Sequence, residues 1–180
     1  MGFEQLEQNL VDVIVEEQIK LGYRNEQIGL YYPLASLNRL LGTDCPVAEM
    51  KEELKRFREY ASERLGTLVF SNQGERFCIK VPAEGVEYVH THSGDHAFLR
   101  AFIQTISKHG CTYEDIRQVF CAYSDKVHVE KMNDEEFDYL FYFEDGRPDD
   151  YRYCVTFEEC HATYHRFTVD DYVDLGFGQD

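Results

Sequence analysis

The chain has 180 residues, of which 43% are hydrophobic, 14% aromatic and 29% charged, and its formal net charge at pH 7 is −16. A chain of this length and apolar content can bury a real core, as one generous domain or two small subdomains, so the composition excludes intrinsic disorder. The acidity excludes general coating of nucleic acids, because a surface with so few cations repels phosphate backbones.

The sequence lacks the patterns of membrane insertion and export. No run approaches the roughly 20 consecutive apolar residues of a membrane-spanning helix, and residues 1–4 have neither the basic nor the apolar character of a secretory signal. The six cysteines include no C-x-x-C pair, and a chain of this length needs no disulfides, so we expect reduced, mostly buried thiols. These features predict a cytoplasmic protein with no membrane partner.

The N-terminal third of the chain carries three apolar patterns of helical period. Residues 4–21 have apolar side chains at helical spacing, and Gly22 stands where a helix C-cap is expected. A short apolar run over residues 34–41 predicts a second helix. The strongest pattern follows Pro46 and predicts a third helix from apolar residues at steps of three and four: Val47, Met50, Leu54, Phe57, Ala61 and Leu65.

Strand patterns follow the third helix. Residues 67–70 and 77–81 are short β-rich runs around Ser71-Asn72-Gln73-Gly74, a composition typical of a hairpin turn, and residues 86–90 predict a third strand. Three helices followed by a hairpin is the order of a winged helix, a fold that usually places its third helix in the major groove of DNA.

The distribution of charge argues against DNA as the partner. Residues 47–64 hold five basic and five acidic side chains, so the third helix has no net charge, whereas residues 101–180 contribute −11. DNA readers usually show a basic bias. The cations available for phosphate contacts are Lys51, Lys55, Arg56 and Arg58 on the helix, with Arg76 and Lys80 on the hairpin. We therefore predict no binding to random duplex DNA, and a winged-helix-like scaffold that serves protein interaction.

The second half of the chain predicts two further helices. Asp95 is placed to cap a helix that continues through residues 98–106. Thr112, with Asp115 three residues later, forms a capping-box-like start for a helix that includes Phe120.

The C-terminal region alternates apolar and polar residues, which is typical of strands. Residues 137–143 and 151–157 form a long hairpin around Asp145-Gly146-Arg147-Pro148, and residues 161–167 return as a third antiparallel strand. Thr168 begins a terminal helical turn.

Together these elements predict an α+β fold. A helical, winged-helix-like subdomain occupies residues 1–92, and an α+β subdomain with a C-terminal antiparallel three-stranded meander occupies residues 93–180. No clear linker separates them, so a single compact domain is the alternative.

Several segments resemble an uncharacterised bacterial family, domain of unknown function 3877. They are Glu16 to Arg24 (EEQIKLGYR), Leu30 to Leu34 (LYYPL), Val127 to Met132 (VHVEKM), Phe137 to Asp150, and Tyr164 to Phe167 (YHRF). The resemblance spans nearly the whole chain and implies a small bacterial cytoplasmic protein. It supplies no activity, ligand or catalytic residue.

One cluster of residues has the chemistry of a metal site. His90, His92, Asp95 and His96 combine imidazoles with a carboxylate, a normal set of ligands for zinc or a related divalent metal. Their spacing, H-x-H-x-x-D-H, is one residue longer than the H-x-H-x-D-H motif of metallo-β-lactamases. The alternative interpretation is that Asp95 caps a helix and the three histidines lie on an exposed turn.

A second group combines thiols and imidazoles: Cys154, Cys160, His161 and His165. Such side chains can bind zinc or form a Cys-His nucleophile pair. Adjacent residues of a strand point to opposite faces, however, and the spacing matches no structural zinc signature. We favour a buried Cys154 beside solvent-facing histidines.

The sequence contains no P-loop, Rossmann or nucleophile-elbow motif, and no coherent set of catalytic residues. The interpretation we favour is a non-enzymatic protein-interaction or regulatory module that binds protein and needs no cofactor. The alternative is a metal-binding protein or metal-dependent hydrolase centred on His90, His92, Asp95 and His96. A winged-helix DNA-binding protein is the third hypothesis.

Overall fold

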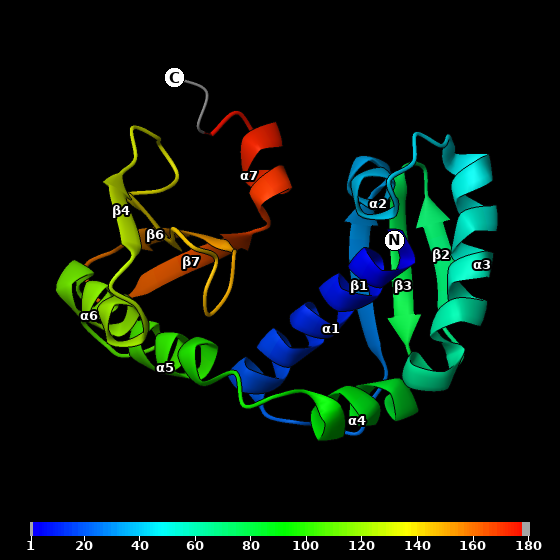
Figure 1. The fold of residues 1–180 in the computed structure, drawn as a ribbon, viewed down its shortest axis with the longest axis horizontal. Coiled ribbons are helices and arrows are strands. Elements are labelled where there is room, and N and C mark those ends of the chain that lie inside the picture. The colour runs from blue at the N-terminus through cyan, green and yellow to red at the C-terminus, as the bar shows by residue number, and fades with distance from the viewer. Residues whose placement is uncertain (1, 178–180) are drawn as a thin grey trace. The chain divides into compact units, whose positions relative to one another are not determined.

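The structure is a computed structural model that describes residues 2–177, and it confirms the predicted α+β class. Within those residues it contains seven helices and two antiparallel sheets, one of three strands and one of four (Figure 1). The chain divides into two compact units, residues 1–95 and residues 96–180. In the described part of the chain, no helix combines the length and the hydropathy that crossing a lipid bilayer requires.

The N-terminal unit builds its helices around a three-stranded sheet. In chain order its elements are α1 (Gly2–Leu21), β1 (Ile28–Pro33), α2 (Leu34–Leu41), α3 (Val47–Leu65), β2 (Val69–Gln73), β3 (Arg76–Val81) and α4 (Ala83–His92). The sheet order is β1-β3-β2, so β3 lies between two edge strands. The three helices and the hairpin predicted before residue 82 are therefore confirmed.

The core of this unit is built from one face of each helix. Five of the six apolar positions that gave α3 its helical period are buried, and Val47 at its start is half-buried; the buried ones are Met50, Leu54, Phe57, Ala61 and Leu65. They meet the buried residues Phe77, Ile79 and Val81, whose alternation places them on the helix-covered face of β3. The other face of β3 carries the exposed residues Arg76 and Lys80, with the buried Cys78 between them. The helical or strand periodicity of the apolar residues thus determines which side chains of each element are buried and which are exposed.

Two expectations for the N-terminal unit are incomplete or wrong. Strand β1 was missing from the prediction. The strand predicted over residues 86–90 is wrong, because these residues lie inside α4. Val86 and Val89 are both buried, and their spacing of three residues places them on one helical face. Gly85 of this helix approaches α3 so closely that an added Cβ would meet the carbonyl group of Leu65.

The C-terminal unit is a four-stranded meander with helices. Its elements are α5 (Ala97–Ile106), α6 (Tyr113–Tyr123), β4 (Val127–Lys131), β5 (Tyr139–Phe143), β6 (Arg152–Phe157), β7 (Ala162–Phe167) and α7 (Val169–Asp174). The sheet order β4-β5-β6-β7 is that of a meander, but it has one strand more than predicted. The predicted capping box is confirmed, since Thr112 and Asp115 exchange hydrogen bonds at the start of α6.

Both faces of this sheet are covered by aromatic side chains. On one face, Phe98 and Phe102 of α5 and Phe120 of α6 pack edge-on against Tyr153. On the opposite face, a smaller cluster of Phe137, Leu140 and Cys154 is covered by half-buried residues that include Tyr172 and Phe177. The alternating aromatics of β5 and β6 therefore belong to the core.

Candidate functional site

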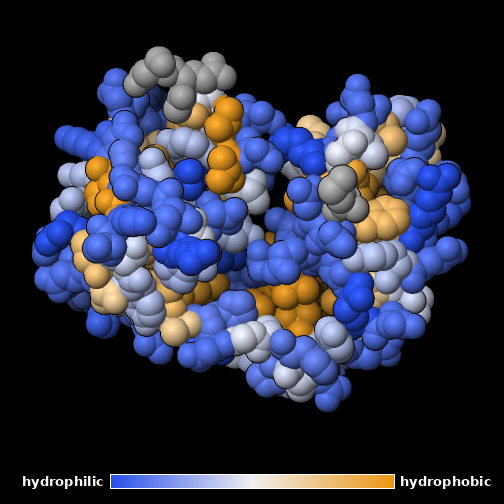
Figure 2. Space-filling model, in the orientation of Figure 1, coloured by the Kyte–Doolittle hydropathy of each residue, from blue (hydrophilic) through white to orange (hydrophobic). Residues whose placement is uncertain are grey.

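A cationic pocket of about 240 Å³ lies between α3 and the β2–β3 hairpin of the N-terminal unit. We call it the Arg58 pocket. Its residues are Lys51, Leu54, Lys55, Arg58, Phe70, Ser71, Asn72 and Phe77. The three cations converge because residues spaced by four and three positions share one face of a helix. Figure 1 shows α3 running beside the edge strand β2, and Figure 2 shows hydrophilic side chains over the visible face of α3.

Among the three cations of the pocket, Arg58 packs against an aromatic side chain. Its guanidinium lies over the ring of Phe70, with Cζ 5.1 Å from the ring centroid. Its Nε atom is buried and has no hydrogen-bond partner within residues 2–177. A buried N–H without an acceptor is unfavourable by about 1–3 kcal/mol. An anion that accepts from Nε would remove this penalty.

The charges around the pocket are unevenly paired. Lys55 Nζ lies 2.7 Å from the carboxylate of Glu52, and Arg56 Nη1 lies 2.7 Å from that of Glu53. Arg56 is not part of the pocket lining. The described residues that line the pocket include no carboxylate. The pocket therefore keeps a net positive charge on a protein that is strongly negative.

The structure separates the cations that the sequence offered for phosphate contacts. Lys51, Lys55 and Arg58 come together, whereas Arg76 and Lys80 lie on the other face of the hairpin. The guanidinium of Arg76 stacks there on Tyr31 of β1, with Cζ 4.9 Å from the ring centroid. Alternate residues of β3 point to opposite faces of the sheet, so these cations do not form one continuous patch.

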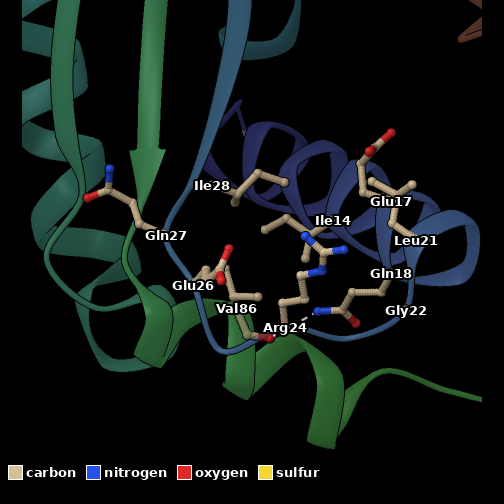
Figure 3. A pocket seen from close by; sticks show the side chains of 10 residues that line it. All are labelled: Ile14, Glu17, Gln18, Leu21, Gly22, Arg24, Glu26, Gln27, Ile28 and Val86. Atoms are coloured by element: carbon tan, nitrogen blue, oxygen red, sulfur yellow. Dashed lines mark hydrogen bonds between the residues drawn. The ribbon is translucent and has the colours of Figure 1, made fainter.

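A second pocket, of about 250 Å³, lies between the end of α1, the following loop and α4 (Figure 3). Ile14, Ile28 and Val86 contribute apolar side chains to it, and Gln18 donates a hydrogen bond of 3.2 Å to the carbonyl oxygen of Val86. Its charged lining residues are Glu17, Arg24 and Glu26. Because its lining contains two carboxylates and one guanidinium, this pocket does not favour an anion.

Two histidines of the predicted metal cluster lie in α4 rather than at a strand end. His90 stacks on Tyr23 with ring centroids 4.0 Å apart, and His92 stacks on Tyr88 with centroids 4.1 Å apart. Nδ1 of His92 also lies 3.0 Å from the carbonyl oxygen of Tyr88. Each histidine ring is therefore fixed by stacking on a different tyrosine.

The remaining two residues of that cluster follow α4. Asp95 is not the N-cap residue of α5; His96 is, in a left-handed conformation with φ of 48°. Nε2 of His96 is buried without a hydrogen-bond partner in the described chain. Across residues 2–177, no three His, Cys, Asp or Glu side chains are grouped to hold a metal ion. Metal binding by these residues stays the alternative hypothesis.

The thiol and imidazole group is spread over two strands and the turn that joins them. Cys154 is fully buried on β6, opposite His165 of β7, whose side chain is exposed. Burial, with added repulsion from Asp134 and Glu136, raises the pKa of the Cys154 thiol to about 12. Such a thiol stays protonated at neutral pH and is a poor nucleophile or metal ligand.

The other two members of that group lie in the turn that joins β6 to β7. Cys160 and His161 are both exposed, and His161 Nε2 lies 2.9 Å from Glu158 Oε2. All six cysteines of the chain are free thiols. Cys78, Cys111 and Cys154 are buried, whereas Cys121 and Cys160 are exposed.

No sequence pattern indicates the buried acid–phenol pair of the C-terminal unit. Tyr153 donates a hydrogen bond of 2.7 Å to Asp149 Oδ2, and the backbone N–H of Tyr151 donates one of 3.2 Å to Oδ1. Burial raises the pKa of the Asp149 carboxyl, while the hydrogen bond from Tyr153 and the charge of Arg166 lower it by less. Because these groups satisfy one another's hydrogen-bonding capacity, we assign them a structural role.

Comparisons with known proteins relate the chain to a family of undetermined function. The family is described as "Domain of unknown function, E. rectale Gene description (DUF3877)", and its model matches residues 3–176. No curated protein and no solved structure matches the chain. The match confirms the resemblance found in the sequence, but it assigns no chemistry to the pockets.

Proposed function

The chain belongs to the DUF3877 family, and we propose that it is a non-enzymatic, cytoplasmic protein-interaction or regulatory module with a winged-helix-like N-terminal unit. The order α1-β1-α2-α3-β2-β3 supports the winged-helix part of this proposal, with the hairpin β2–β3 directly after α3. The antiparallel pairing of β1 with β3 supports it further, because it closes the three helices and the hairpin into one body.

One observation supports a protein rather than DNA as the partner. On the exposed side of α3, Lys55 is paired with Glu52 and Arg56 with Glu53. Helices that read DNA use such cations for phosphate contacts, and a carboxylate one turn away competes with the phosphate. The −11 net charge of residues 101–180 adds unfavourable long-range repulsion of a nucleic acid.

The proposal is tested by measuring both kinds of partner with the full chain. Fluorescence anisotropy with a random duplex at physiological salt is expected to show no binding. Affinity capture from the native host is expected to recover the same protein repeatedly. Micromolar or tighter DNA binding that weakens with salt and is lost in a Lys55→Glu, Arg58→Glu variant would overturn the proposal. Repeated failure to find a partner, together with turnover in a substrate screen, would also overturn it.

A further inference from the structure

We propose that the Arg58 pocket is a binding site for a phosphate monoester dianion. The inference goes beyond the proposed function, because the pocket can be filled by a free phosphorylated metabolite or by a phosphoserine of a partner. Both sources present the same group, and the experiment below separates them.

The charge of the pocket fits a dianion. Lys51 and Arg58 have no carboxylate partner within the described residues, and Lys55 has one, Glu52. Three cations with one paired carboxylate leave two positive charges. A phosphate monoester carries about −1.5 to −2 charges at pH 7, whereas a carboxylate carries only one. A monoester therefore neutralises the pocket, and a carboxylate does so only in part.

The hydrogen-bonding state of Arg58 points to the same ligand. The buried Nε–H lacks an acceptor, and a phosphate offers three strong acceptor oxygens. Phe70 holds the guanidinium by stacking, so fewer arginine conformations are lost when the anion binds. Arg58 is thus preorganised, while the exposed Lys51 can move onto a second oxygen.

The size and lining of the pocket limit the ligand to a small group. Its volume of about 240 Å³ lies below the roughly 300–1,000 Å³ of pockets that enclose whole drug-sized ligands. A single phosphate with its short linker fits this space better than a complete nucleotide cofactor. The pocket at the end of α1 is of similar size but contains Glu17 and Glu26, so it serves as an internal comparison that should not bind the same ligand.

The experiment titrates the isotope-labelled full chain with O-phospho-L-serine and follows backbone amide signals by NMR. We expect saturable shifts at Lys51, Arg58 and Phe70, and no saturation with serine or glutamate. Arg58→Gln and Lys51→Gln should each weaken binding by about tenfold or more, because each removes a charge-assisted hydrogen bond. Arg56→Gln makes the same charge change on the same helix outside the pocket, so binding should stay within about twofold.

The two sources are separated by a phosphoserine peptide. Binding at least about tenfold tighter than that of O-phospho-L-serine identifies a phosphorylated partner, and equal binding identifies a free metabolite. Both results support the site. Lys51 is exposed, so its variant tests the site even if Arg58→Gln does not fold.

The inference would be overturned by no saturation up to about 10 mM ligand, by equal binding of glutamate, or by equal losses in the Arg56→Gln and Arg58→Gln variants. Displacement of O-phospho-L-serine by a tighter-binding DNA duplex would also overturn it, since the cations would then serve a DNA surface. Failure of the ligand titration leaves the proposed protein-interaction function intact, because that function is measured by capture of a partner.

Discussion

Tyr153 donates its phenolic hydrogen to Asp149 Oδ2 over 2.7 Å, and this bond ties the loop between β5 and β6 to the centre of the C-terminal unit. The Tyr153 side chain is fully buried, and burial is the main reason that the pKa of its hydroxyl lies well above the ordinary value. The phenol therefore stays protonated and acts as a permanent donor to the carboxyl group.

Replacing this donor should destabilise the protein. Tyr153→Phe leaves Asp149 Oδ2 without its hydroxyl partner, and we expect a loss of about 2 kcal/mol in the free energy of unfolding at pH 7. Urea denaturation measures the change. Tyr139→Phe is the matched control, because it removes a hydroxyl that makes no hydrogen bond among residues 2–177. Equal losses in the two variants would show that the bond between Tyr153 and Asp149 adds nothing specific.

The raised pKa of Asp149 predicts a defined pH dependence. The folded protein holds this proton more tightly than the unfolded chain, whose Asp pKa is about 3.9. The stability of the wild type relative to Asp149→Asn should therefore be greatest below that pH. It should fall as pH rises through the raised pKa and then level off. Denaturation of both proteins across this range tests the prediction, and parallel stability curves would contradict it.

The fold could be predicted where apolar residues recur with the period of a helix or a strand. Helix α3 buries the apolar positions of a regular helical period except the first, Val47, which is half-buried, so its bounds follow from the sequence. Burial along strand β1 does alternate, with Leu30 and Tyr32 on the buried side, but Pro33 ends the strand at once, so the alternation is too short to be recognised in the sequence. The segment around Val86 was misassigned because a short apolar run fits a strand and a helix equally well.

The candidate site could be predicted only in part, because it depends on contacts between elements. The spacing of Lys51, Lys55 and Arg58 placed them on one helical face, but only the position of β2 brings Phe70 under Arg58. The bond between Asp149 and Tyr153 depends on the path of a loop. Sequence alternation marks Tyr153 as a core residue and gives no indication of its partner.

Because α4 approaches α3 closely at Gly85, we expect substitution of this glycine to destabilise the protein. In Gly85→Ala the added Cβ would collide with the backbone carbonyl of Leu65 and the side chain of Val81. Because backbone must move, we expect a loss of about 1–3 kcal/mol in the free energy of unfolding. Gly94→Ala is the control, since its Cβ would meet no atom within 4 Å, and its effect should stay within about 0.5 kcal/mol. A tolerated Gly85→Ala would show that the helices separate readily.

The geometry of α4 predicts that protein purified without chelator or nickel resin contains far less than one equivalent of zinc, iron or manganese. Residues two positions apart on a helix are separated by about 200° around its axis, so His90 and His92 point to opposite sides. Their rings are stacked on Tyr23 and Tyr88, and freeing them for a metal would break both contacts.

Elemental analysis of the wild type and of His90→Ala and His92→Ala measures the metal content directly. His161→Ala provides the control, because its exposed side chain lies in the β6–β7 turn of the other unit. Near-stoichiometric metal that disappears in the His90 and His92 variants but not in the control would contradict the prediction. In that case α4 would have to rearrange, since the two rings cannot reach one ion from opposite sides of a regular helix.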